Sequence, residues 1–196
     1  NPFYTQLSVS AKKYFIWSEQ MLNDIASVHN LSIPQSRIEL IGPYPFFDFY
    51  KSRKNHKVIG NHSKFIGFAC AFCDVIFLQH EIQLIKKIAS IASHLGFEIL
   101  VRPYPSLPIS EYDELKSIKN VTLYIPKDAA YEDRYGDGRE HILFSSNEER
   151  HEYLAQCVLF LSTGTSFTIE AAIDNLPIIQ IYLDTEFRKE SFEKDL

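Results

Sequence analysis

The sequence predicts an α/β protein built on a doubly wound parallel sheet. Short apolar runs alternate with amphipathic helical patterns along most of the chain, which is typical of βαβ units. The apolar runs are nearly continuous, as expected of strands that helices cover on both faces. Right-handed crossovers between such strands bring the loops after them to one edge of the sheet, where ligands bind.

The first part of the chain reads as strand, helix and strand. An apolar run at 14–17 precedes Ser18, a helix-capping residue, and apolar positions at helical spacing follow it. A second strand is expected at 37–41, after which the glycine and prolines of 42–45 interrupt regular structure. The polar stretch 46–63 is expected to be a linker.

Residues 64–196 contain the rest of the predicted sheet. The expected strands are 64–72, 97–101, 121–125, 141–144, 158–161 and 178–183. The expected helices are 81–95, 110–119, about 146–156, and one after residue 166 that stops at Asn175. Ser110 with Asp113, and Ser146 with Glu149, have capping-box spacing. The charged stretch 126–139 is expected to be a surface loop.

A cluster of small and hydroxyl-bearing residues follows the strand at 158–161. It comprises Ser162, Thr163, Gly164, Thr165 and Ser166. Unpaired N–H groups and the helix dipole favour an anion at such a helix start. A plain N-cap is the alternative, but one cap needs only one hydroxyl, so the cluster favours a pyrophosphate site. It matches neither a Walker loop nor a dinucleotide-binding glycine motif.

Two charged residues extend this predicted site. Arg102 follows the strand 97–101 and precedes a Pro-Tyr-Pro segment, which holds the loop extended. An arginine at the carboxyl end of a strand can bind phosphate through two hydrogen bonds. Glu170 lies in the first two turns of the following helix, where it could accept from sugar hydroxyls. The alternatives are a salt-bridged arginine at the sheet edge and a carboxylate that faces solvent.

These segments together resemble the nucleotide-sugar-binding half of GT-B glycosyltransferases, specifically the bacterial surface-carbohydrate and CDP-glycerol-type transferases. The segments that carry the resemblance are 158–183, Trp17-Ser18-Glu19, Ile41-Gly42-Pro43 and Val101-Arg102-Pro103-Tyr104-Pro105. The resemblance implies that 1–45 is the last βαβ piece of an incomplete N-terminal acceptor domain. Residues 64–196 would form the Rossmann-like, donor-binding C-terminal domain. Tyr104 stands where the family often has histidine, and its phenol can still donate to phosphate.

The resemblance also implies a function, which is transfer from a nucleotide-activated donor in the biosynthesis of surface polysaccharide such as capsule. Arg102 and residues 162–166 would hold the donor phosphates, and Glu170 would hold ribose or sugar hydroxyls. The nucleobase would lie at the end of the strand 121–125, against Tyr124, Ile125 and Pro126, although a plain strand end is the alternative there. The missing domain would bind a carbohydrate or lipid-linked acceptor and supply the general base. We therefore assign no catalytic residue and expect this chain alone to be inactive.

The composition and charge of the chain limit which kinds of partner it can bind. A formal net charge of −5 argues against a nucleic-acid binder, which would present a basic patch. No apolar run approaches the roughly 20 residues of a membrane span. We expect a cytoplasmic protein that can associate peripherally with the inner face of the membrane. The densest basic cluster, at 51–57, is either a solvated linker or a patch for anionic lipid.

Neither a metal nor a cofactor is expected. Asp133 and Asp137 do not form the Asp-x-Asp pair that metal-dependent sugar transfer uses. Cys70 and Cys73 have C-x-x-C spacing without a second pair of ligands, and the odd count of three cysteines, with Cys157, indicates buried thiols in a reducing compartment. A GT-B site instead neutralises its leaving group with a helix dipole, arginine and hydroxyls.

Two alternatives remain open. One is a UDP-sugar 2-epimerase-like enzyme, and the other is a non-catalytic α/β module that binds an anion or a partner protein.

Overall fold

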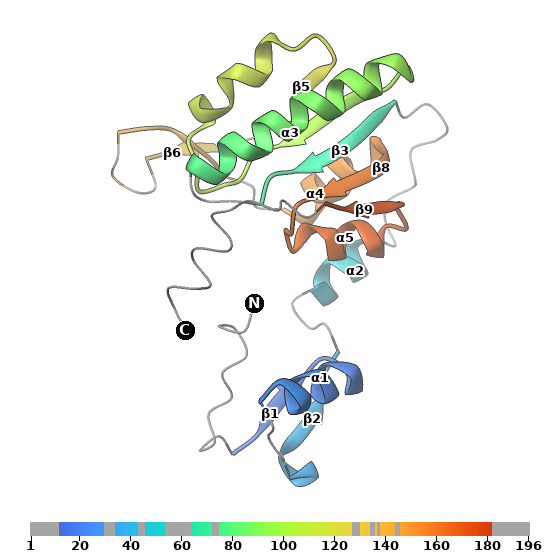
Figure 1. The fold of residues 1–196 in the computed structure, drawn as a ribbon. Coiled ribbons are helices and arrows are strands. Elements are labelled where there is room, and N and C mark those ends of the chain that lie inside the picture. The colour runs from blue at the N-terminus through green and yellow to red at the C-terminus, as the bar shows by residue number, and fades with distance from the viewer. Residues whose placement is uncertain are drawn as a thin grey trace. The chain divides into compact units, whose positions relative to one another are not determined.

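The structure is a computed structural model that describes residues 12–29, 34–42, 46–53, 64–71, 75–126, 130–133, 136, 138–143 and 146–181 (Figure 1). The chain divides into two compact units, Asn1–Asp48 and Phe49–Leu196. None of the described helices is both long enough and apolar enough to cross a membrane.

The first unit contains the predicted strand, helix and strand. Strand β1 (Tyr14–Ile16), helix α1 (Glu19–His29) and strand β2 (Ile38–Leu40) follow in order, with a 3₁₀ turn, η2 (Gln35–Arg37), before β2. The two strands are parallel, with Ile16 opposite Leu40. The Ser18 hydroxyl accepts a hydrogen bond from Met21 N at 3.1 Å, so it caps α1 as predicted.

Helix α2 (Phe47–Arg53) lies in the stretch predicted to be a linker. Phe49 on this helix is 2% exposed and packs in the core of the second unit. A helix can place apolar side chains on one face and bury them there, which explains why this stretch is helical. The division into an acceptor remnant, a linker and a donor domain stays a prediction.

The second unit is built on five parallel strands in the order β5-β4-β3-β8-β9. Their bounds are β3 (Phe65–Ala69), β4 (Glu98–Arg102), β5 (Val121–Leu123), β8 (Cys157–Ser162) and β9 (Ile178–Gln180). The chain runs outward from β3 to β5 and then returns to the other side of β3 with β8. The predicted doubly wound parallel sheet is thus confirmed, with its topological switch point between β3 and β8.

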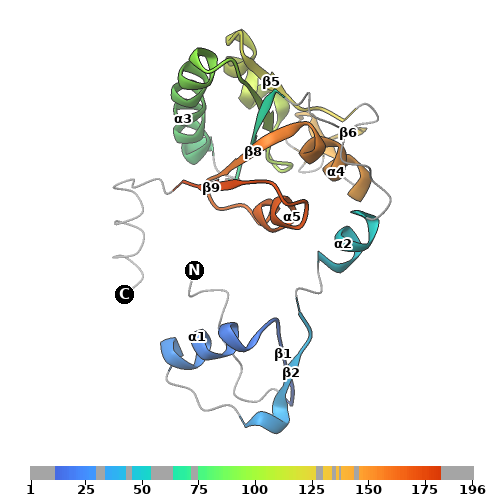
Figure 2. The same cartoon turned by 90° about the vertical axis from the view of Figure 1, so that its right-hand side faces the viewer.

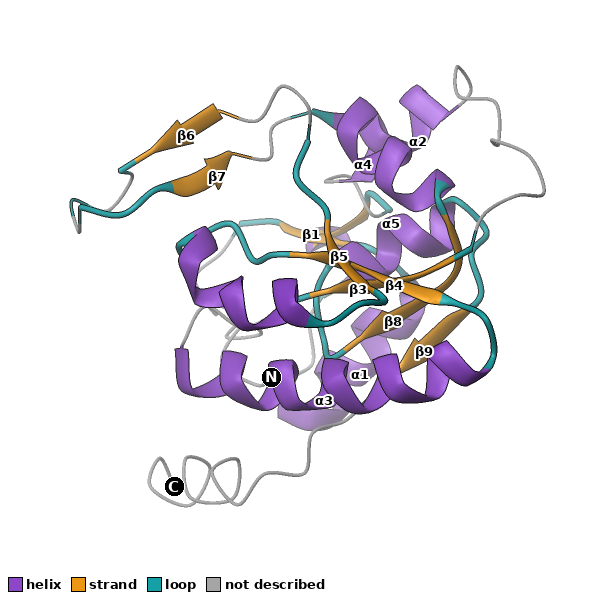
Figure 3. Cartoon of the chain, turned by 90° about the horizontal axis from the view of Figure 1, so that it is seen from above, coloured by secondary structure: helices purple, strands orange, loops and turns teal. Residues whose placement is uncertain are grey.

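Helices cover both faces of this sheet (Figures 2 and 3). Along β4, Ile99 and Val101 pack with α3 (Val75–His94) and with the 3₁₀ helix η4 (Ile109–Ser117). Leu100 points to the other face and packs with α4 (Asn147–Ala155) and α5 (Phe167–Ile173). Both faces are buried, which explains the continuous apolar runs in the sequence.

Two helices differ from their predicted form. Helix α3 begins at Val75, six residues before the predicted start at 81, and its first turns already bury Leu78. The segment predicted as a capping-box helix at 110–119 is the 3₁₀ helix η4, which starts after Pro108 without a side-chain cap. Proline fixes φ in that first turn, so Ser110 is not needed as a cap.

The segment at 130–143 also differs from its prediction. Strand β7 (His141–Leu143) pairs antiparallel with β6 (Ala130–Glu132), which lies in the stretch predicted to be a loop. The prediction that 141–144 belongs to the parallel sheet is therefore wrong. A parallel strand needs a crossover of a dozen or more residues, usually a helix, and 126–139 has no helical pattern.

Candidate functional site

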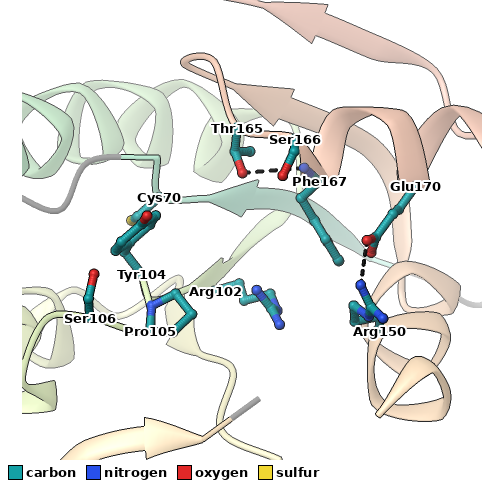
Figure 4. A pocket seen from close by; sticks show the side chains of 10 residues that line it. All are labelled: Cys70, Arg102, Tyr104, Pro105, Ser106, Arg150, Thr165, Ser166, Phe167 and Glu170. Carbon is teal, nitrogen blue, oxygen red and sulfur yellow. Dashed lines mark hydrogen bonds and ion pairs between the residues drawn. The ribbon is translucent and has the colours of Figure 1, made fainter. Parts of the chain in front are cut away.

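A cavity of about 410 Å³ opens at the carboxyl ends of the central strands (Figure 4). Its lining comes from the segments after β3, β4 and β8 and from helices α4 and α5. The lining residues are Cys70, Arg102, Tyr104, Pro105, Ser106, Arg150, Thr165, Ser166, Phe167 and Glu170. The β3 and β8 segments flank the switch point of the sheet, which is where doubly wound folds bind ligands.

Arg102 is fixed in this cavity by a buried ion pair. Its Nη2 and Nε atoms donate to the two carboxylate oxygens of Glu149 at 3.3 and 3.5 Å, and Arg102 is 9% exposed. The guanidinium also lies over the ring of Phe167, with its Cζ 4.7 Å from the ring centroid. The alternative, a salt-bridged arginine at the sheet edge, is therefore observed, and phosphate binding by Arg102 stays a prediction.

A second guanidinium, on Arg150 of α4, enters the same cavity. Its Nη1 donates to Glu170 Oε1 at 2.5 Å, and its Nη2 donates to Asn147 Oδ1. In Figure 4, Arg102 lies between Pro105 and Arg150, and Glu170 points toward Arg150. With both carboxylates ionised, the two arginines and the two glutamates carry no net charge.

Glu170 is only 4% exposed, so the alternative of a carboxylate that faces solvent is wrong. Its Oε2 atom is buried and has no hydrogen-bond partner among the described residues. Burial raises the pKa of Glu170 above its ordinary value, while the nearby guanidinium groups of Arg150 and Arg102 oppose that shift. The cavity therefore contains a carboxylic acid whose ionised form is disfavoured by burial.

The hydroxyl cluster after β8 divides into two parts. Ser162 is buried, and its Oγ accepts from the backbone N–H groups of Gly164 and Thr165 at 3.1 and 3.3 Å, which folds the loop. Thr163 is also buried and donates to Glu81. Gly164, at φ +128°, has the left-handed backbone that glycine favours. None of these three residues lines the cavity.

Thr165 and Ser166 are the members of the cluster that line the cavity. Thr165 Oγ1 accepts from Phe167 N at 3.3 Å, whereas Ser166 precedes α5 without making a side-chain cap. Helix α5 has seven residues, about two turns, so its dipole is short. The two arginines are therefore the stronger source of positive charge in the cavity.

The predicted nucleobase contacts lie beside the cavity rather than in its lining. Tyr124 is half-buried, donates to Glu149 O at 3.2 Å, and stacks edge-on against Tyr153. Burial raises the pKa of its phenol. Neither Ile125 nor Pro126 lines the cavity. Their role in base binding stays a prediction.

A fully buried glutamate ties the two loops at the switch point together. Glu81 of α3 accepts from Ala71 N at 3.1 and 3.3 Å and from the Thr163 hydroxyl. It thereby joins the loop after β3 to the loop after β8. Cys70 lies beside it, and burial raises the pKa of that thiol well above its ordinary value.

The described residues contain no group of three or more metal-ligating side chains. Cys70 and Cys157 are buried thiols, and Cys73 lies outside the described residues. Helix α3 begins at Val75, two residues after Cys73. Asp137 also lies outside the described residues.

Three residues of the site were not predicted from the sequence, namely Glu81, Glu149 and Arg150. Glu81 had a readable signal, since it falls on the apolar stripe of α3 between Leu78 and Ile85. Glu149 was interpreted only as part of a capping box, and its N–H does donate to Ser146 Oγ at 3.0 Å. Nothing in the sequence distinguishes Arg150 from an exposed helix arginine.

Comparison with known proteins agrees with this architecture. No protein-family model matches the chain, and no curated protein matches it in sequence. UDP-GlcNAc 2-epimerase from Methanocaldococcus jannaschii, in complex with UDP-GlcNAc and UDP, is similar with a TM-score of 0.61. Its identity is 16%, and the match covers 93% of this chain and 48% of that one. A second structure of that enzyme matches with a TM-score of 0.50, at 16% identity over 93% and 49% of the two chains.

A second protein, TarM, is also similar in structure. A mutant of S. aureus TarM, in complex with fondaparinux, alpha-GlcNAc-glycerol and UDP, matches with a TM-score of 0.50 at 11% identity. The match covers 94% of this chain and 32% of TarM, so the chain spans about half of the epimerase and a third of TarM. These likenesses show the fold, which is the Rossmann-like half of a GT-B architecture.

Proposed function

We propose that the cavity binds the diphosphate of a nucleotide-activated sugar and that the chain is the donor-binding half of a GT-B glycosyltransferase. One observation carries the proposal. Two guanidinium groups from different elements, Arg102 and Arg150, meet in one cavity at the switch point of a doubly wound sheet. Planar guanidinium groups match phosphate oxygens in geometry and charge.

Each side chain of the cavity has a role in this proposal. Arg102 and Arg150 bind the two phosphates, and the hydroxyls of Thr165 and Ser166 donate to them. Glu170 contacts a ribose or sugar hydroxyl. Ser162 and Thr163 make hydrogen bonds that fold the loop and tie it to Glu81, and direct contact of Ser162, Thr163 or Gly164 with phosphate stays a prediction.

Such a site accelerates transfer by stabilising the departing nucleotide. Negative charge grows on the diphosphate as the sugar leaves, and preorganised donors stabilise that charge without a metal. Stacking of Arg102 on Phe167 holds one guanidinium ready for this task. No general base is assigned among the described residues. The acceptor, a role in surface polysaccharide synthesis and attachment to a membrane remain proposals that rest on the sequence resemblance.

A 2-epimerase activity on a nucleotide sugar is the second candidate. The structural similarity to the M. jannaschii epimerase, at a TM-score of 0.61, favours it. The two reactions begin from the same bound donor and differ in product. In the two-domain protein that the sequence resemblance implies, incubation with UDP-GlcNAc and a glycerol or saccharide acceptor separates them. The epimerase yields the 2-epimer without acceptor, whereas the transferase yields a glycosylated acceptor and UDP.

Isothermal titration tests the shared step, which is donor binding. We expect the protein to bind UDP-GlcNAc, UDP or CDP, and Arg150→Gln to weaken that binding roughly tenfold to a hundredfold, as for a lost charge-assisted hydrogen bond. Arg139→Gln is the matched control. Arg139 also pairs with a glutamate, Glu111, at 2.7 Å, but lies outside the cavity.

Two results would contradict the proposal. The first is negligible heat with UDP-GlcNAc, UDP, CDP and CDP-glycerol alike. The second is equal weakening by Arg150→Gln and Arg139→Gln, which would indicate a nonspecific effect of surface charge.

A further inference from the structure

The cavity holds two arginine–glutamate pairs, and their charges affect how an anion can bind there. Arg102 faces Glu149, and Arg150 faces Glu170, so the free site is close to neutral while both acids are ionised. A diphosphate adds two negative charges to this site. A guanidinium that is released from its ion pair offsets one of these charges and offers all of its donors to the ligand.

The two acids differ in how many of their carboxylate oxygens have a hydrogen-bond donor. Glu149 accepts from Arg102 through both of its oxygens and lies in the first turn of α4, where the helix dipole favours a negative charge. Glu170 accepts from Arg150 through one oxygen, and its buried Oε2 has no hydrogen-bond partner among the described residues. A buried charged oxygen without a donor is costly, so Glu170 is the acid that gives up its charge more readily.

We infer that binding of the diphosphate is coupled to uptake of one proton by Glu170, which frees Arg150 from its ion pair to hold the phosphate. This inference rests on the proposed function and concerns the same cavity. The proton comes from solvent and adds to the carboxylate, which becomes a neutral carboxylic acid. The ligand takes the place of that carboxylate as the counter-ion of Arg150.

The surroundings of Glu170 support this exchange. The charged groups that act on it from the neighbouring elements are Arg150, Arg102 and Glu149. Burial raises the pKa of Glu170, and the two guanidiniums oppose the shift. A diphosphate that occupies both guanidiniums weakens this opposition and adds repulsion, so the pKa of Glu170 rises further on binding.

Proton counting by calorimetry tests the inference. UDP-GlcNAc is the probe, because its diphosphate is esterified at both ends and lacks the terminal phosphate that titrates near pH 6. Titrations at pH 6, 7 and 8, each in two buffers of different ionisation enthalpy, give the number of protons taken up. We expect uptake that approaches one proton per ligand and a Kd that rises toward tenfold per pH unit above the pKa of free Glu170.

Two variants identify the group that takes up the proton. Glu170→Gln mimics the neutral acid, so its proton uptake falls to zero and its Kd no longer changes between pH 6 and pH 8. Glu111→Gln is the matched control, because Glu111 also accepts from an arginine, at 2.7 Å, but outside the cavity. That variant keeps the proton uptake and pH dependence of the wild type.

The outcomes are distinct. Binding of UDP-GlcNAc by the wild type without proton uptake overturns the inference and leaves the proposed function standing, and this result does not depend on the folding of any variant. Uptake that persists in Glu170→Gln also overturns it. Absence of binding at every pH removes the proposed function, and the inference with it.

Discussion

The buried pair of Arg102 and Glu149 separates a binding role from a structural one. The two side chains are only 10% and 9% exposed. Arg102→Met removes the cation and leaves a buried carboxylate without its partner. Loss of one member of a buried ion pair costs about 3–5 kcal/mol, so we expect a loss of that size in the free energy of unfolding. Glu149→Met leaves a buried cation and is destabilising for the same reason.

The double variant Arg102→Met/Glu149→Met has a different expected outcome. Replacement of a whole buried pair by apolar side chains of similar volume is often neutral or stabilising, so stability returns to within about 1–2 kcal/mol of the wild type. Affinity for UDP-GlcNAc does not return, because the guanidinium that binds phosphate is still absent.

The assay must report on the second unit. Trp17 is the single tryptophan of the chain and belongs to the first unit. Tryptophan fluorescence would therefore report the unfolding of the first unit, whereas both substitutions lie in the second. Urea unfolding followed by far-UV circular dichroism, together with calorimetric titration of UDP-GlcNAc, measures both quantities. A double variant that regains affinity along with stability would refute a direct role for Arg102. A double variant as unstable as Arg102→Met would refute the electrostatic explanation of that loss.

Three further changes have outcomes that follow from single contacts. Gly67→Ala places a Cβ 2.7 Å from Cys157 Sγ, so it lowers stability in urea by about 1–3 kcal/mol, and added Cys157→Ala recovers most of the loss. Glu81→Ala leaves the Thr163 hydroxyl and a backbone N–H without their acceptor and costs at least about 1–3 kcal/mol; an unchanged midpoint would contradict the tie between the loops. Because burial raises the pKa of Glu170 above 4.5, the folded state holds that proton more tightly than the unfolded chain. The free energy of unfolding of the wild type, relative to that of Glu170→Gln, therefore falls as pH rises from about 4.5 through the raised pKa. A difference between the two proteins in urea that stays constant from pH 4 to 8 would contradict this.

The sheet was predictable because its strands carry a simple signal. β4 and β8 are nearly continuous apolar runs, and their helical neighbours have clear spacing, so the alternation of strands with helices predicts parallel strands. Strand β7 was not predictable in this way. A three-residue apolar run has no periodicity that separates a parallel strand from half of a hairpin.

The candidate site was predictable in outline but not in detail. Arg102, Thr165, Ser166 and Glu170 were predicted to be near one another, and all four line one cavity, because the carboxyl ends of parallel strands share an edge. The sequence could not show that Ser162 turns inward, because hydroxyls that fold a loop and hydroxyls that face a ligand are the same residue types. Partners of the charged groups depend on side-chain packing between distant segments, which local patterns do not record.

A crystal structure of the protein with UDP-GlcNAc tests the central claim most directly. We predict that the diphosphate lies in the cavity, within hydrogen-bonding distance of Arg102 and Arg150 and of the Thr165 or Ser166 hydroxyl. A bound ligand whose phosphates lie away from both arginines would contradict the assignment of this cavity as the donor site.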